Sequence, residues 1–436
     1  MGIFFCMDSI ALYELFDGRV DRIVTDTRKL KEGDIYFSLK GANFNGNEFA
    51  PQALEKGASF VVVDENIGLE SRVIRVDDVL KSMQGLAQLH RKKMNAKVIG
   101  ITGSNGKTTT KELLYFILKE KFQTLATQGN LNNHIGVPLT IFKLEPRHEV
   151  LVLEMGANKP GDIKELTEIG VPDMALITSL GKAHIEGFGS FEGVIKTKKE
   201  LFDDVANRGG TLFFNLNDPQ LNQMYSLFKD GLSFGDKKTN SDYTYELLQQ
   251  IPEIKLRAFY DLDAVDYFAH LFGVHNYQNV IASITIARHL GLDIEQISKG
   301  LDDYYPQNMR SQITTWGNNK VILDAYNANP ASMSAAIESF REFEHNEKWV
   351  VLGKMAELGD SSQEEHQNLT ELLVSAGFEK VILIGSEYNN KLAQDKFILF
   401  ENVDLAKSWI YKNMPKEKLI LIKGSRSSQL EKILTE

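Results

Sequence analysis

The stretch Gly103-Ser-Asn-Gly-Lys-Thr-Thr109 joins an apolar run to a helical run, and it decides the fold of the central part of the chain. The preceding residues 97–102 are short and apolar, which predicts a buried strand, and residues 110–120 place apolar side chains on one helical face. Strand, glycine loop and helix N-terminus direct backbone N–H groups toward one anion. Lys107 adds a charge for the β- and γ-phosphates, and Thr108 offers a hydroxyl group to Mg²⁺. The pattern predicts a nucleotide site that uses ATP.

This loop matches a shorter form of the Walker A phosphate loop. The strict spacing requires a glycine at position 101, where this chain has Ile101. A bare Gly-Lys-Thr is more often an ordinary turn, so the prediction depends on the strand and the helix that flank it. The residues that we expect to contact ATP are Gly103, Ser104, Asn105, Gly106, Lys107, Thr108 and Thr109.

Length and composition limit the class of protein. A chain of 436 residues is too long for a single core, so several domains are expected. The net charge of −10 argues against nucleic acid as a partner. Cys6 is the single cysteine, which excludes an internal disulfide and favours a reducing compartment, the cytoplasm. Residues 1–8 lack the basic segment of a signal peptide, and no stretch has the roughly 18 apolar residues of a membrane span.

The order of strand-like and helical runs predicts an α/β fold with three domains. Residues 1–76 form a small α/β domain, residues 77–304 a central phosphate-loop ATPase domain, and residues 305–436 a Rossmann-like doubly wound domain. The strand-like runs are 34–39, 59–63, 97–102, 150–154, 174–178, 321–324, 349–352, 381–385 and 419–423. Because the central strands are apolar throughout, we expect a mostly parallel sheet that is buried on both faces. Residues 276–290 have the pattern of an amphipathic helix that closes the central domain.

Two residues of the central domain are candidates for metal binding. Glu154 ends an apolar strand, and open α/β sheets bind ligands at the carboxyl ends of their strands, so its carboxylate can bind a metal ion. A helix cap or a surface carboxylate fits the same position equally well. His184 lies in a glycine-containing loop, which suggests a close approach to a ligand, although a lone histidine is more often structural.

Two further groups have both a chemical and an ordinary interpretation. Lys196, Lys198 and Lys199 are by default a solvated helix face, but one of them could be buried and reactive, since desolvation lowers the pKa of lysine. Asn276 and Asn279 stand at a helix start, where asparagine is commonly a cap, but their amides could also pair with adenine.

These residues together resemble the ATP-dependent Mur ligases of peptidoglycan synthesis. The resemblance rests on Gly103-Ser-Asn-Gly-Lys-Thr-Thr109, Glu154, His184, Lys198 and the Asn276/Asn279 pair. Other motifs, spread over all three blocks, are similar to the family member that adds the terminal dipeptide. They are Asp26-Thr-Arg-Lys29, Ser38-Leu-Lys-Gly41, Gly129-Asn-Leu-Asn-Asn-His-Ile-Gly-Val-Pro-Leu-Thr140, Glu186-Gly-Phe-Gly189, Tyr326-Asn-Ala-Asn-Pro330 and Lys423-Gly-Ser-Arg426.

The resemblance implies a cytoplasmic ligase that joins D-alanyl-D-alanine to UDP-N-acetylmuramoyl-tripeptide through an acyl phosphate, producing ADP and phosphate. Lys107 is implied to contact the transferred γ-phosphoryl group, and Thr108 and Glu154 to ligate one Mg²⁺. His184 and a carbamylated Lys198 are implied to serve a second Mg²⁺. Carbamylation converts a neutral amine and CO₂ into an anion that suits a hard metal.

The remaining implied contacts are with the nucleotide and the two substrates. For ATP they are Asn276, Asn279, Arg310 and Asp324. For the substrates they are Asp26, Thr27, Arg28, Lys40, Asn45, Gly46, Asn132, Asn133, Asn327, Asn329, Ser425 and Arg426. The first domain is implied to hold the uridine nucleotide and the last domain the dipeptide. A monomer is expected, with no nucleic acid partner and no membrane insertion.

Three positions depart from the family pattern. Ala325 stands where a small polar residue or cysteine is usual, Lys354 where aspartate is more common, and Asn47 where histidine is common. The alternatives are a sister ligase that adds one amino acid or a folylpolyglutamate-type synthetase, which should lack the 326–330 motif. A non-catalytic nucleotide-switched binding protein is a third alternative. The third residue of the tripeptide, lysine or diaminopimelate, stays open.

Overall fold

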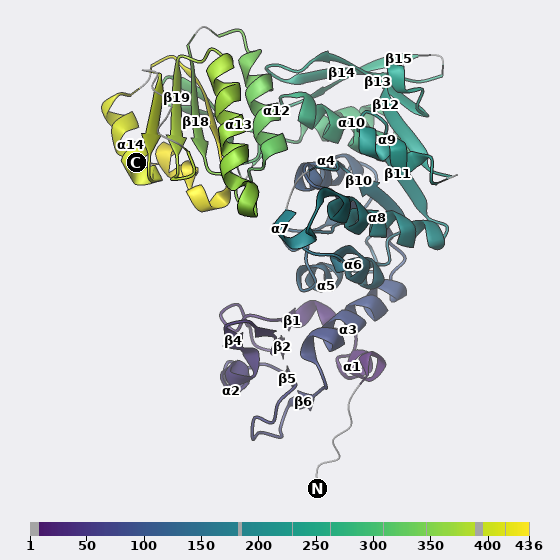
Figure 1. The fold of residues 1–436 in the computed structure, drawn as a ribbon. Coiled ribbons are helices and arrows are strands. Elements are labelled where there is room, and N and C mark those ends of the chain that lie inside the picture. Colours follow the sequence, from purple (N-terminus) through teal and green to yellow (C-terminus); the bar gives the residue numbers. More distant parts are fainter. Residues whose placement is uncertain are drawn as a thin grey trace.

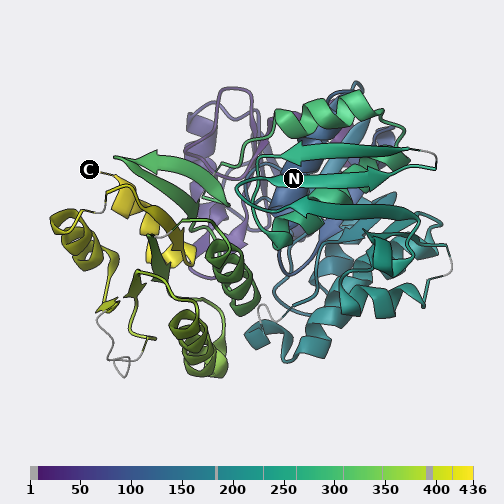
Figure 2. The ribbon, with the colours of Figure 1, turned by 90° about the horizontal axis from the view of Figure 1, so that it is seen from above.

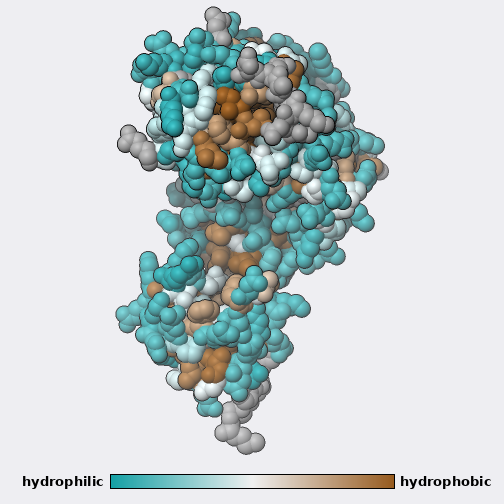
Figure 3. Space-filling model, turned by 60° about the vertical axis from the view of Figure 1, so that its left-hand side comes forward, coloured by the Kyte–Doolittle hydropathy of each residue, from teal (hydrophilic) through white to brown (hydrophobic). Residues whose placement is uncertain are grey.

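The computed structural model describes residues 8–181, 185–228, 230–261, 263–307, 309–345, 347–388, 396–414 and 416–435. Three main sheets, each with its own helices, follow one another along this part of the chain (Figure 1). The outline narrows between the first sheet and the rest of the molecule, as the space-filling view also shows (Figure 3). Seen from above, the third sheet lies beside the second (Figure 2). None of the described helices is long and apolar enough to span a bilayer.

The first sheet is parallel, with the strand order β1-β2-β5-β6. Its elements are α1 (Ser9–Leu15), β1 (Ile23–Val24), β2 (Ile35–Phe37), β3 (Lys40–Gly41), β4 (Phe44–Asn45), α2 (Ala50–Glu55), β5 (Phe60–Val63), β6 (Val73–Arg75) and α3 (Val79–Lys93). Helix α3 begins after Asp78, whose carboxylate caps it by accepting a hydrogen bond from the Lys81 N–H at 2.9 Å. Helix α3 connects the two domains, since it packs on α1 of the first domain and on α5 (Gly136–Ile141) and α6 (Asp162–Gly170) of the central domain, and a single apolar core extends across both.

The central sheet has the strand order β15-β14-β13-β12-β11-β10-β7-β9-β8 and is parallel from β8 to β13. Its elements are β7 (Lys97–Thr102), α4 (Lys107–Leu118), β8 (Thr124–Ala126), α5 (Gly136–Ile141), β9 (Val150–Glu154), α6 (Asp162–Gly170), β10 (Met174–Ile177), α7 (Ile185–Phe188), α8 (Phe191–Asn207), β11 (Thr211–Asn215), α9 (Pro219–Tyr225), β12 (Leu232–Asp236), β13 (Tyr243–Gln249), β14 (Ile254–Phe259), β15 (Ala264–Ala269), α10 (Val274–His289) and α11 (Ile294–Asp302). Strands β7 and β9 are neighbours, and Ile101 pairs with Glu154. This register places the phosphate loop beside the Glu154 carboxylate.

Two features of the central domain differ from the sequence prediction. Beyond β13, strands β14 and β15 extend the sheet in antiparallel fashion, and burial alternates along β14 because one face of this extension is only partly covered. The prediction of an amphipathic helix for 276–290 is wrong, since α10 has an unbroken run of buried residues from Asn279 to Ala287. Helix α10 contacts the sheet, α4 and the next domain, and α11 follows it.

The third sheet has the strand order β16-β17-β21-β18-β19-β20 and is parallel except for the β16–β17 pair. Its elements are β16 (Gln312–Trp316), β17 (Asn319–Asp324), α12 (Pro330–Arg341), β18 (Lys348–Gly353), α13 (Ser362–Ser375), β19 (Lys380–Ile384), β20 (Phe397–Phe400), α14 (Val403–Lys412) and β21 (Leu419–Lys423). One apolar cluster includes residues of α12 and α13, and a second, on the other face, includes residues of α14. The fold is therefore a three-domain α/β fold dominated by parallel sheets.

The central and C-terminal domains meet along α12. Phe272, two residues before α10, is fully buried in the apolar cluster of the C-terminal domain, and its ring centroid lies 6.0 Å from that of Phe343. The Gln250 side chain donates a hydrogen bond to Glu342 nearby. The two domains thus share an apolar contact at the C-terminal end of α12.

Replacing Phe272 by alanine is expected to lower the free energy of unfolding by about 3–5 kcal/mol, because the cavity left by the ring cannot close fully. Urea unfolding at equilibrium measures this change. Phe268→Ala is the matched control, since the Phe268 side chain on β15 is 55% exposed. Equal destabilisation by both substitutions would contradict a specific role of Phe272 between the domains.

Candidate active site

The phosphate loop connects β7 to α4, and two of its positions require glycine. Gly103 has φ 151° and Gly106 has φ 83°, which side chains disfavour. A Cβ atom at Gly103 would lie 2.0 Å from Thr178 Oγ1, and one at Gly106 would lie 2.2 Å from Asn279 Oδ1. The loop is therefore packed against the end of β10 on one side and α10 on the other.

A cavity of about 690 Å³ opens above this loop, between the central and C-terminal domains. Predicted residues that line it are Ser104, Asn105, Gly106, Lys107, Thr108, Thr109, Asn132, Asn133, Glu154, Asn276, Asn279, Arg310, Asp324 and Asn327. The structure thus brings together predicted residues from two domains that lie far apart in the sequence.

The Glu154 carboxylate is buried beside the phosphate loop. Its Oε1 atom accepts hydrogen bonds from Thr108 Oγ1 at 3.2 Å and from Asn132 Nδ2 at 2.8 Å. Its Oε2 atom is buried and has no hydrogen-bond partner among the described residues. Burying an unpaired carboxylate oxygen is costly, so this arrangement suits a bound cation. In the described ranges, no three His, Cys, Asp or Glu side chains are grouped so that they could hold a metal ion, and His184 lies outside these ranges.

The Lys107 side chain is folded back on its own loop. Its Nζ atom donates a hydrogen bond to the Gly103 carbonyl at 2.5 Å. Burial lowers the pKa of Lys107, which the charge of Glu154 opposes and that of Arg310 reinforces. The Lys107 amino group is therefore held against the loop whose backbone N–H groups would bind a phosphate group.

Lys198 lies on α8 and is almost completely buried, at 2% exposure. Burial lowers its pKa well below the usual range, and the charge of Lys107 lowers it further. Its Nζ atom lies 5.8 Å from the centre of the Phe188 ring, and no carboxylate pairs with it in the part of the chain that the structure describes. Lys196 is exposed and Lys199 pairs with Asp203. The solvated-face interpretation thus holds for these two lysines and is wrong for Lys198.

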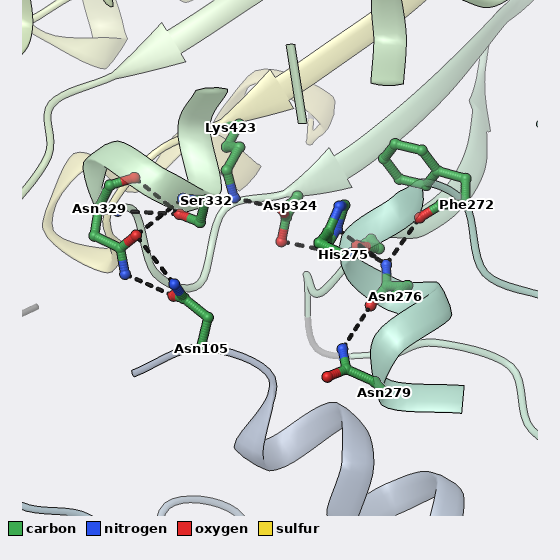
Figure 4. A network of polar contacts seen from close by, with 10 residues as sticks. Asn105, Phe272, His275, Asn276, Asn279, Asp324, Asn329, Ser332 and Lys423 are labelled. Carbon is green, nitrogen blue, oxygen red and sulfur yellow. Dashed lines mark hydrogen bonds and ion pairs between the residues drawn. The ribbon is translucent and has the colours of Figure 1, made fainter. Parts of the chain in front are cut away.

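The start of α10 carries a chain of amide contacts on the other side of the cavity (Figure 4). Asn279 Nδ2 donates to Asn276 Oδ1 at 3.1 Å. Asn276 Nδ2 in turn lies 3.0 Å from the Phe272 carbonyl and 3.1 Å from Ser311 Oγ. Neither asparagine caps the helix, since Gly273 holds the cap position. The chain of contacts links α10 to the segment that enters the C-terminal domain.

Asp324 ends β17 and forms a buried ion pair with Lys423 at the end of β21, with 2.5 Å between Oδ2 and Nζ. Although burial raises the pKa of Asp324, Lys423 more than compensates, so the pKa is lowered. Arg310 stacks on the Tyr326 ring, with the guanidinium carbon 3.9 Å from its centre. Both acidic and basic groups therefore line the cavity from the C-terminal side.

Comparison with known proteins places these features in one family. The chain matches family models described as the Mur ligase family catalytic domain (residues 19–105), the Mur ligase middle domain (residues 101–287) and the Mur ligase glutamate ligase domain (residues 309–426). It is 33% identical over 430 residues to the UDP-N-acetylmuramoyl-tripeptide–D-alanyl-D-alanine ligase of Bacillus subtilis, covering 95% of this chain and 92% of that one. The chain belongs to the Mur ligase family.

Other relatives and solved structures agree with this family. The corresponding ligase of Escherichia coli is 32% identical, over 96% of this chain and 94% of that one. A MurF structure from Acinetobacter baumannii has a TM-score of 0.86 at 31% identity, covering 94% of this chain and 92% of that chain. The MurF ligase of Thermotoga maritima in complex with ADP also has a TM-score of 0.86, at 28% identity, covering 96% of this chain and 97% of that chain. The three-domain α/β prediction is confirmed.

The residues predicted to contact the uridine nucleotide lie in the first domain of this Mur ligase, away from the cavity. Asp26 accepts hydrogen bonds from Arg28 Nε at 2.9 Å and Nη2 at 2.8 Å, which lowers the pKa of Asp26 to about 2. Lys40 Nζ lies 2.9 Å from carboxylate oxygens of both Asp64 and Glu65. Thr27 lies beside Asp26 and Arg28 between β1 and β2, Asn45 on β4 pairs with Lys40 on β3, and Gly46 follows Asn45.

The three departures from the family pattern have different structural consequences. Asn47 is buried, and its side-chain amide forms hydrogen bonds with the side chains of Ser38, Asn45 and Asp64. It therefore holds its loop in place rather than facing solvent. Ala325 is fully buried in an apolar cluster. Lys354 Nζ lies 3.2 Å from Glu387 Oε1, so its charge is paired within the C-terminal domain.

Several other predicted residues are held by their own domain. Asn133 Oδ1 accepts hydrogen bonds from the Ile135 and Gly136 N–H groups at the start of α5. Ser425 is buried, and its backbone N–H donates to the Lys354 carbonyl at 3.1 Å. Arg426 Nη1 lies 2.9 Å from Glu431 Oε1. Asn329, Ser425 and Arg426 are not among the residues that line the cavity.

Sequence reasoning missed part of the cavity wall. Polar and charged residues that line the cavity and were not assigned a role include Asn130, His134, Lys159, Asp162, Glu165, His275, Ser311, Ser332 and Glu357. Asp162 and Glu165 follow the carboxyl end of β9, where the strand-end rule indicates ligands. Glu357 has φ 61°, an unusual backbone conformation that becomes visible only in the structure.

His275 predicts a pH dependence of stability. Burial lowers its pKa from 6.5 to about 4, against a raising effect of Asp324 and with a lowering effect of Lys423. The unfolded state therefore binds a proton at His275 that the folded state does not, and we expect this residue to contribute a fall in stability of at most about 3 kcal/mol as pH drops from 6.5 to 4. His275→Gln should reduce this fall in urea unfolding curves, whereas His134→Gln, at an exposed position, should not. An unchanged slope in His275→Gln would contradict the assignment.

Proposed function

We propose that this Mur ligase joins D-alanyl-D-alanine to UDP-N-acetylmuramoyl-tripeptide at the expense of ATP and produces the UDP-N-acetylmuramoyl-pentapeptide precursor of peptidoglycan. The observation that supports this most strongly is the identity of about one third to ligases with this printed name over nearly the whole chain. The Tyr326-Asn-Ala-Asn-Pro330 run, whose first two residues line the cavity, favours this activity over that of a sister ligase.

The residues around the phosphate loop fit Mg²⁺. The unpaired Oε2 atom of Glu154 and the Thr108 hydroxyl are hard oxygen donors, and Asn132 orients the carboxylate. We propose that Thr108 and Glu154 hold one Mg²⁺. When bound, the metal neutralises charge on the transferred phosphoryl group. Lys107 supplies a further positive charge from the protein side.

Lys198 fits the proposed carbamate. A buried lysine with a strongly lowered pKa carries a neutral amine, which attacks CO₂, forms a new N–C bond and releases one proton. The carbamate is an anion with two oxygen donors. We propose that it serves a second Mg²⁺ together with His184.

The reaction requires that the carboxylate first be activated, so that an amine can attack its carbonyl carbon. The terminal carboxylate of the tripeptide attacks the γ-phosphorus of ATP, and ADP leaves, which yields an acyl phosphate. The amine of D-alanyl-D-alanine then attacks the carbonyl carbon, and the C–O bond to phosphate breaks. Lys107 reduces the repulsion between the carboxylate and the triphosphate. The domain arrangement places the phosphate loop and the C-terminal domain on opposite walls of one cavity, where the intermediate is protected from water.

We further propose domain limits of 1–76, 77–304 and 305–436, with the uridine nucleotide held by the first domain and the dipeptide by the third. The single cysteine supports a reducing compartment, and we propose the cytoplasm. We propose a monomer, and sedimentation of the chain as a single copy would support it. Adenine is proposed to lie near Asn276 and Asn279, with Arg310 and Asp324 toward the rest of the nucleotide.

One assay tests the proposed activity. Phosphate release from ATP should require both UDP-N-acetylmuramoyl-tripeptide and D-alanyl-D-alanine, and the product should contain the dipeptide. Release that is unaffected by omitting the dipeptide would eliminate the proposal. Single amino acids in place of the dipeptide test the sister-ligase alternative. A comparison of the lysine and diaminopimelate tripeptides identifies the third residue.

A further inference from the structure

The phosphate-loop residue Asn105 is oriented by the end of β10. Its backbone N–H donates to Ser179 Oγ at 3.0 Å, and its carbonyl accepts from Thr178 Oγ1 at 2.5 Å and from Ser179 Oγ at 3.2 Å. Because both backbone groups are turned toward β10, the side chain extends from the loop in the direction of the C-terminal domain (Figure 4).

Asn329 stands at the start of α12, in the C-terminal domain, and is almost fully buried. Its Oδ1 atom caps the helix by accepting from the Ser332 N–H at 3.0 Å, and Ser332 Oγ accepts from the Asn329 N–H at 3.1 Å. The Nδ2 atom is thereby left to point away from the helix. It donates to Asn105 Oδ1 at 2.6 Å, and Asn105 Nδ2 lies 3.4 Å from Asn329 Oδ1.

This interdomain amide pair of Asn105 and Asn329 lies at the N-terminal end of α12, whereas Phe272 and Gln250 contact the other end. Helix α12 is thus attached to the central domain at both ends. The two attachments differ in kind, since the Phe272 contact is apolar whereas Asn105 and Asn329 are joined by hydrogen bonds. The amide pair consists of two neutral side chains. Asn105 lines the cavity and belongs to the phosphate loop, whereas Asn329 is not among the lining residues.

We propose that the interdomain amide pair positions the start of α12 over the phosphate loop and so couples cleavage of ATP to amide formation, an inference that rests on the proposed function. Asn105 and Asn329 are positioning residues in this proposal. When the pair is broken, water enters the cavity and attacks the carbonyl carbon of the acyl phosphate. The C–O bond to phosphate then breaks, and the carboxylate and dihydrogen phosphate are released, so ATP is consumed without ligation.

The test measures phosphate released per amide formed. Asn329→Ser keeps a good helix cap but is too short to contact Asn105, and Asn105→Ser removes the other half of the pair. We expect a ratio of one in the unmodified enzyme and a rise of at least about threefold in either variant, with the double variant no worse than the single ones. Asn402→Ser is the matched control, because Asn402 caps α14 with the same chemistry and no interdomain contact is found for it in the described part of the chain.

The proposal would be overturned by a ratio of one in both variants. It would also be overturned if the increases in the ratio from the two single substitutions added up in the double variant. A second measurement is independent of the reaction. In the ligand-free protein, Asn105→Ser should accelerate hydrogen exchange of the backbone amides at 331–334 at least about threefold, although the substitution is in another domain. Unchanged exchange at these amides would equally overturn the proposal that the amide pair positions the start of α12. Failure of the unmodified enzyme to form an amide would instead refute the proposed function, and the exchange measurement would still decide about the pair.

Discussion

Lys107→Ala is expected to abolish ligation, lowering kcat by at least about 10³-fold at saturating ATP. The Lys107 ammonium group lies within the phosphate loop, 2.5 Å from the Gly103 carbonyl, and it is the basic side chain that the loop itself contributes. Two anions, the triphosphate and the carboxylate, must approach each other during phosphoryl transfer. Removal of a positive charge from a partly buried site raises the cost of that approach, since water screens it poorly there.

The steady-state phosphate-release assay with both substrates measures this loss. Lys119→Ala is the matched control, because Lys119 lies exposed at the other end of the same helix, α4. The control is expected to retain activity within about twofold, as is usual for surface substitutions. Retention of a tenth or more of the activity by Lys107→Ala would contradict the assigned role.

Lys198→Ala is expected to lower kcat by about 10²- to 10³-fold, on the scale seen when an electrostatic group is removed from an active site. If Lys198 is carbamylated, the substitution removes an anion and leaves space on α8 for a small carboxylate. Short carboxylates such as formate or acetate should therefore restore part of the activity, whereas bicarbonate should not, because no amine remains to capture CO₂.

Two comparisons make the Lys198 prediction specific. Lys196→Ala, at an exposed position two residues earlier on α8, should keep nearly full activity. The unmodified enzyme should lose activity when CO₂ is depleted and recover it with bicarbonate. Full activity of Lys198→Ala would count against the carbamate, and failure of every carboxylate to restore activity would count against the idea that an anion is what the site needs.

The sequence predicted the parallel strands because they are continuous apolar runs. β9, β10 and β21 begin where the runs begin, since strands buried on both faces need apolar residues at every position. β14 was not predicted, because an alternating pattern of apolar and polar residues over six positions also occurs in short segments that are not strands. α10 was misread as amphipathic, since only tertiary packing shows that it is covered by the sheet, α4 and the C-terminal domain together.

For the candidate site, sequence reasoning worked where chemistry is local. The phosphate loop and Glu154 follow directly from strand ends, and the register of β7 and β9 brings them together. Composition could not show which of Lys196, Lys198 and Lys199 is buried, because one helix carries all three. The contact between Asn105 and Asn329 joins residues 224 positions apart, and no local pattern indicates such a pairing.

The close packing of Gly103 and Gly106 has a consequence for inhibitors of this enzyme. A compound that rests against the phosphate loop gains contact with two positions at which any side chain would collide with Thr178 or Asn279. Resistance by substitution at these positions would cost the loop its conformation, and with it the nucleotide site. Resistance mutations should therefore arise elsewhere on the cavity wall. Few of them should weaken a ligand that draws its affinity from the loop backbone.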